Sequence, residues 1–68
     1  MYKKTIIIKM LARTYESAFK KLKAITTDNG WGMPSVYAVF VNGYKYSFTF
    51  EVAAKAEDHF TTEAYEID

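Results

Sequence analysis

The chain has 68 residues, of which 50% are hydrophobic and 18% aromatic, and it has a formal net charge of +1 and no cysteine. This apolar content excludes a disordered chain, and the lack of cysteine excludes disulfides, thiolate nucleophiles and Cys-ligated zinc. The length is enough for one domain spanning residues 1–68, whose aromatic rings supply core area that small domains often lack.

The hydrophobic residues do not form a membrane-crossing segment. No apolar run approaches the roughly 20 residues that a bilayer requires. The basic start, Met1 to Thr5, leads into alternating strand-like residues rather than a long apolar stretch, so no signal peptide is expected. A soluble, cytoplasmic protein without a membrane partner is the prediction.

Charge is distributed unevenly along the chain. Residues 1–24 carry seven basic side chains and one acidic side chain, a net charge of +6, whereas residues 25–68 carry two basic and seven acidic side chains, a net charge of −5. Such a split can steer a charged partner. We favour internal complementarity, in which the acidic last strand lies near the basic first strand.

Residues 2–12 have the alternation of a strand and the β-branched residues that favour one. The even positions are mostly apolar and are expected to face the core: Tyr2, Lys4, Ile6, Ile8, Met10 and Ala12.

A helix is predicted from about Tyr15 to Thr27. Thr14 is a suitable N-cap, and Asn29 or Gly30 is suited to end the helix in a left-handed conformation. One apolar stripe follows the helical period: Tyr15, Ala18, Phe19, Leu22 and Ile25.

A loop over residues 30–35 precedes a predicted hairpin. The strands are Val36–Val41 and Tyr44–Val52, and Asn42-Gly43 forms a two-residue turn. The predicted core-facing pairs are Val41 with Tyr44, Val39 with Tyr46, Tyr37 with Phe48 and Ser35 with Phe50. The opposite face then pairs Phe40 with Lys45, Ala38 with Ser47 and Val36 with Thr49.

The C-terminal part is predicted as a connection over residues 53–58, with one helical turn, and a last strand over residues 59–67. A bulge near Thr62 would reconcile Phe60 and Ala64, on one face, with Tyr65 and Ile67 on the other. Two topologies remain open: a tight hairpin beside the third strand, or a crossing connection that leaves the first strand in the middle.

The predicted fold is therefore α+β with the order β-α-β-β-β. One helix packs on one face of a four-stranded, mostly antiparallel sheet.

The residues give no basis for an enzyme, a cofactor or a metal site. His59 is the only histidine, and the adjacent Asp58 would point to the opposite side of a strand. The C-terminal carboxylates lack the spacing of a calcium loop, and the glycines lack the helix and lysine of a phosphate loop. A surface role for His59 and a solvated acidic edge are the simpler interpretations.

A protein-binding surface is the first functional hypothesis. A one-helix domain leaves the outer face of its sheet uncovered, and tryptophan is enriched at binding hot spots. The candidate contact residues are Ile7, Lys9, Trp31, Val36, Phe40 and Lys45. Two other interpretations stay open: Trp31 closes the end of the core, which we favour, and the outer face is a homodimer interface or ordinary surface.

The alternative is a nucleic-acid binder that uses the basic helix and the first strand. Lys20, Lys21 and Lys23 are its candidate phosphate contacts. The near-neutral charge and the lack of an RNA-recognition motif disfavour it.

The size and strand order resemble the small stand-alone proteins with which phages and mobile elements block host machinery, which implies an inhibitor or regulator. A designed scaffold is disfavoured by the irregular loop around Trp31.

Overall fold

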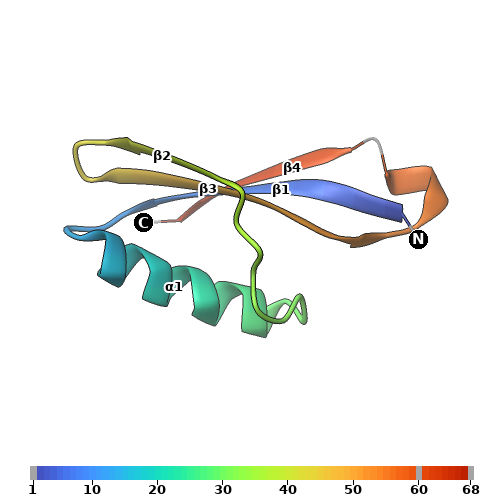
Figure 1. The fold of residues 1–68 in the computed structure, drawn as a ribbon, viewed down its shortest axis with the longest axis horizontal. Coiled ribbons are helices and arrows are strands. Elements are labelled where there is room, and N and C mark those ends of the chain that lie inside the picture. The colour runs from blue at the N-terminus through green and yellow to red at the C-terminus, as the bar shows by residue number, and fades with distance from the viewer. Residues whose placement is uncertain (1, 60, 68) are drawn as a thin grey trace.

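Four strands form one mixed sheet, and a single helix packs on one of its faces, in the computed structural model, which describes residues 2–59 and 61–67 (Figure 1). The strand order is β2-β3-β1-β4, with β1 antiparallel to β3 and parallel to β4. The elements are β1 (Tyr2–Leu11), α1 (Tyr15–Asp28), β2 (Ala38–Asn42), β3 (Lys45–Ala54), the 3-10 helix η1 (Ala56–Asp58) and β4 (Thr62–Ile67). The predicted α+β class and mostly antiparallel sheet are confirmed.

The two central strands, β1 and β3, provide most of the core. Their side chains alternate between the faces of the sheet, so every second residue points toward α1. The side chains that this alternation buries are Ile6, Ile8 and Met10 of β1 and Tyr46, Phe48, Phe50 and Val52 of β3. The predicted orientation of the even positions of the first strand is therefore confirmed from Ile6 onward.

Helix α1 has a capping interaction at each end. At its start, the Thr14 hydroxyl accepts a hydrogen bond of 3.1 Å from the Ser17 amide. At its end, Gly30 takes a left-handed φ of 73°, and the Trp31 amide bonds to the Thr26 carbonyl at 2.8 Å. This is the pattern of a Schellman motif, in which glycine adopts the positive φ at little cost. The helix therefore begins at the predicted residue and ends one residue later than predicted.

The predicted register of the hairpin differs from the observed register by two residues. The structure pairs Asn42 with Lys45 and Val41 with Tyr46, so the turn consists of Gly43 and Tyr44. Gly43 has a φ of 64°, and no non-glycine residue in the described chain has a positive φ. An Asn-Gly type I′ turn needs a positive φ at both central residues, whereas a type II′ turn needs it only at a first-position glycine. A shift of two residues keeps the paired side chains of β2 and β3 on their predicted faces.

The predicted burial of β2 is also wrong. Val39 and Val41 face the helix side of the sheet but remain 41% and 50% exposed, and Tyr37, which precedes β2, is 61% exposed. Tyr44 lies in the turn and is 69% exposed. The reason is that α1 lies over the central strands, whereas β2 forms an edge of the sheet (Figure 1).

The crossing connection is the topology that forms. Helix η1 leads from β3 past the start of β1 to β4, which lies parallel to β1 from Thr5↔Thr62 to Met10↔Ile67. This register contains no bulge, and the strand begins at Thr62 rather than at the predicted residue 59. The predicted direction of Phe60 lies outside the described residues. The start of β1, the end of β3 and η1 all extend beyond α1 (Figure 1).

Candidate partner-binding surface

A hollow of about 460 Å³ lies mainly on the sheet face opposite α1, toward the end that carries the β2–β3 turn. Its lining includes Lys9, Leu11, Phe40, Lys45 and Glu66. These side chains come from all four strands because odd positions of β1 and β3 share the outer face with even positions of β2 and β4. The sheet itself thus brings together residues that are distant in the sequence.

The hollow combines exposed apolar side chains with lysines. Phe40 is 71% exposed and Leu11 is 45% exposed, and both line the same hollow. Within residues 2–59 and 61–67, Lys9 and Lys45 have no carboxylate within the 4.0 Å of an ion pair. The surface therefore offers an apolar centre beside two cations that are not neutralised by an internal salt bridge.

Four of the six predicted contact residues share this face. Lys9, Phe40 and Lys45 line the hollow, and Ile7 is partly buried on the same face, level with Thr49. Leu11, which the alternation of the first strand already predicts on this face, also lines the hollow, as does Glu66, which was not predicted there. Glu66 was not recognised because its position depends on the pairing of β4 with β1.

Trp31 and Val36 lie elsewhere, and the expected position of Val36 on the outer face is wrong. Both side chains are partly buried against the core. The Trp31 ring lies 5.8 Å from that of Phe50 and 6.1 Å from that of Tyr65. Trp31 therefore closes the core, the interpretation favoured from the sequence. Val36 precedes β2, which begins only at Ala38, so the strand alternation does not fix its direction.

The helix lysines do not join the outer-face lysines in one basic surface. Lys21 donates a 2.9 Å hydrogen bond to the Leu11 carbonyl, and Lys20 and Lys23 lie beside Phe19 on α1. Lys9 and Lys45 lie on the other side of the sheet. A single nucleic-acid strand would have to pass around the sheet edge to contact both groups.

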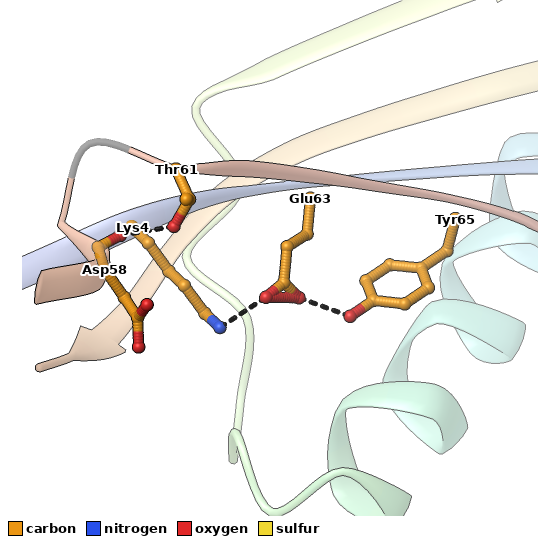
Figure 2. A network of polar contacts seen from close by, with 5 residues as sticks. All are labelled: Lys4, Asp58, Thr61, Glu63 and Tyr65. Carbon is orange, nitrogen blue, oxygen red and sulfur yellow. Dashed lines mark hydrogen bonds and ion pairs between the residues drawn. The ribbon is translucent and has the colours of Figure 1, made fainter.

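A polar network occupies the helix-side face at the junction of β1 and β4. The Lys4 ammonium donates a 2.6 Å hydrogen bond to Glu63, and the Tyr65 hydroxyl donates to the other oxygen of the same carboxylate (Figure 2). The expected contact between the basic first strand and the acidic last strand is therefore present.

The same hydrogen bonds shift the protonation equilibria of the three groups. The hydrogen bond from Lys4 lowers the pKa of Glu63, and the reciprocal bond raises the pKa of Lys4. The hydrogen bond to Glu63 raises the pKa of the Tyr65 phenol. Lys4 and Tyr65 therefore stay protonated and Glu63 stays ionised near neutral pH, which suits a structural link better than proton transfer.

His59 lies beside Tyr2 at the start of β1 and does not line the hollow. Its Nδ1 donates a hydrogen bond to the Ala56 carbonyl, and its ring lies 4.8 Å from that of Tyr2. It follows η1 and is not part of a strand as predicted. In the part of the chain that the structure describes, no group of three His, Asp or Glu side chains is placed to hold a metal.

The described residues contain no helix with the length and apolar character needed to cross a membrane.

No known family model, curated protein or solved structure matches the chain. The arrangement of the surface residues is therefore the basis for a functional assignment.

The Lys4–Glu63 pair predicts an acid-dependent loss of stability. Because folding lowers the Glu63 pKa below its usual 4.5, its contribution is present above that value and is lost as pH falls through the folded pKa. The melting temperature of Glu63→Gln should be lower than that of the wild type near neutral pH, with the two converging in acid. Thermal melts across this pH range measure the difference.

A Lys4→Met variant provides the control for this experiment. It should remove most of the same pH-dependent difference, since only the Tyr65 hydrogen bond to Glu63 remains, and combining it with Glu63→Gln should add little because both changes break the Lys4–Glu63 pair. The raised Lys4 pKa predicts a second loss, as pH rises through that pKa at the alkaline end. Equal pH profiles for wild type and Glu63→Gln would contradict the assignment.

Proposed function

We propose that this protein is a small, non-catalytic protein-binding module that acts in the cytoplasm as an inhibitor or regulator of a larger protein. The observation that supports the proposal is the exposed Phe40 in an outer-face hollow, beside Leu11 and two lysines without an internal ion pair. Aromatic residues are enriched at protein interfaces, where a few central residues inside a polar rim supply most of the binding energy.

The chemistry of the hollow indicates the kind of partner. Phe40 and Leu11 favour an apolar side chain on the partner, because contact removes apolar surface from water on both sides. Lys9 and Lys45 favour carboxylates next to that side chain, which would speed association and fix the orientation of the complex. The expected partner surface is therefore an apolar residue flanked by acidic residues.

The polar network around Glu63 and the single histidine both lie away from this hollow. The Glu63 carboxylate accepts hydrogen bonds from Lys4 and Tyr65 on the helix-side face. The His59 ring packs on Tyr2 at the far end of β1. A binding role therefore agrees better with the placement of these groups than a catalytic role.

The proposal predicts a selective effect of Phe40→Ala. Capture of partners from a cell lysate, identified by mass spectrometry, should lose its specific partner with this variant, since a hot-spot truncation costs about 2 kcal/mol or more and weakens binding roughly thirtyfold. Met33→Ala is the matched control because Met33 is 75% exposed but lies in the loop after α1.

Two further measurements distinguish the alternatives. Lys9→Glu with Lys45→Glu should weaken the same complex, whereas nuclease treatment should leave it unchanged. Capture that disappears with nuclease, together with affinity that falls steeply with salt, would instead support the nucleic-acid binder. Equal capture by wild type and Phe40→Ala would contradict the proposed surface.

A further inference from the structure

The exposed apolar side chains are concentrated on β2 and its flanking residues. Among the described residues, five of the ten exposed large hydrophobic side chains lie between residues 37 and 44. They are Tyr37 at 61%, Val39 at 41%, Phe40 at 71%, Val41 at 50% and Tyr44 at 69% exposure. No charged residue occurs from Asn29 to Tyr44, so nothing in this segment opposes contact with another apolar strand.

The two edge strands of the sheet differ in how well their sequences discourage pairing with a strand of another molecule. Edge strand β4 carries Glu63 and Glu66, and charges of this kind discourage association of sheet edges. Edge strand β2 has the sequence Ala-Val-Phe-Val-Asn and contains neither a charge nor a proline. An uncharged strand rich in β-branched and aromatic residues pairs readily with another strand when it is left open.

The backbone of β2 has hydrogen-bonding groups directed outward. The turn closes on the Asn42↔Lys45 pair, and hydrogen-bonded pairs alternate with non-bonded pairs along an antiparallel ladder. Phe40 and Asn42 therefore bond to β3, whereas the amides and carbonyls of Val39 and Val41 point to the open edge. A strand placed there would find donors and acceptors at the correct spacing.

We propose that the occupant of this edge is β2 of a second copy of the chain, paired antiparallel about a two-fold axis at Phe40. Val39 of one copy then exchanges hydrogen bonds with Val41 of the other, and the two Phe40 rings lie opposite each other on the outer face. The pairing is self-complementary, as a two-fold interface requires, and it brings no like charges together. It continues the sheet through both molecules, and it shares Phe40 with the proposed partner-binding surface.

The available area agrees with a specific dimer. A large aromatic side chain buries on the order of 150–250 Å², so the exposed parts of Tyr37, Phe40 and Tyr44 together amount to roughly 400 Å². With the two valines, each copy exposes about 500 Å², so complete burial of these side chains in the pair would remove about 1,000 Å², the lower limit for a specific interface. A dimer in equilibrium with monomer is expected.

The test is the oligomeric state of the full chain. Sedimentation velocity at concentrations up to about 100 µM should show wild type approaching twice the 7.8 kDa mass of one chain. Val41→Lys places a charge on the edge and should shift the protein to monomer, weakening the dimer at least tenfold. Leu11→Lys is the matched control: Leu11 is 45% exposed but lies on the central strand β1, so its dimer should persist.

Hydrogen exchange provides a second measurement that does not depend on any variant. The amides of Val39 and Val41 should gain protection as wild-type concentration rises, whereas the Phe40 amide, already bonded to β3, should change little. Wild type that remains monomeric at the highest concentration would overturn the proposal. So would a dimer that Leu11→Lys disrupts and Val41→Lys leaves intact, because that result places the contact on the outer face.

Discussion

Phe48→Ala is expected to leave little folded protein at room temperature. Phe48 is fully buried, and its ring lies 5.9 Å from Tyr15 and 6.3 Å from both Phe19 and Tyr46. Truncating a buried phenylalanine costs about 3–5 kcal/mol, because the surrounding side chains collapse only partly into the cavity. A chain of this length has about 3–10 kcal/mol of total stability, so the loss is comparable with the whole.

Circular dichroism during thermal and urea unfolding measures this effect. Phe40→Ala is the control, since it removes the same atoms from the neighbouring strand at a position that is 71% exposed. Its stability should lie within about 0.5 kcal/mol of the wild type in the monomer. Similar losses in the two variants would show that the outer face of β2 is covered in the folded molecule.

Leu22→Ala is expected to have the second largest effect, at about 2–5 kcal/mol. Leu22 is fully buried in the middle of α1, and Ala18 and Thr26 are the other buried residues of this helix. Since alanine is the best helix former, the change should not weaken the helix itself. The loss comes from the contact between the helix and the sheet.

Two measurements show how much stability Leu22→Ala loses and whether the loss is confined to α1. Urea unfolding gives its size, and native-state hydrogen exchange reports whether α1 opens separately from β1 and β3. Lys20→Ala is the matched control because it shortens an exposed side chain on the same helix. A Leu22→Ala protein as stable as Lys20→Ala would mean that α1 contributes little to holding the core together.

Local sequence signals predicted those parts of the fold that depend on neighbouring residues. Thr14 and Gly30 marked the ends of α1, and the alternation in β1 identified the face that Ile6 and Ile8 bury. The hairpin register depended on whether Asn42 or Tyr44 joins Gly43 in the turn. Both choices segregate the side chains by face, so the hydrophobic pattern did not distinguish them.

Long-range packing decided the features that the sequence left unpredicted. Tyr37 and Val41 have the pattern of core residues, but a single helix is too narrow to cover an edge strand as well as the central ones. Whether β4 pairs with β1 or with β3 depended on the path of the connection between β3 and β4, which the local sequence does not determine. For the surface, Lys9, Phe40 and Lys45 were predictable from alternation alone, whereas Glu66 required the pairing of β4 with β1.

The central position of β1 has a consequence for biosynthesis. Its two hydrogen-bonding neighbours are β3 and β4, and roughly 50 residues separate the end of β1 from the start of β4. At a translation rate of about 5–20 residues per second, the Ile6-Ile7-Ile8 segment spends several seconds without its neighbouring strands. Lys3, Lys4 and Lys9 flank this segment, and flanking charges of this kind slow the aggregation of nascent apolar strands.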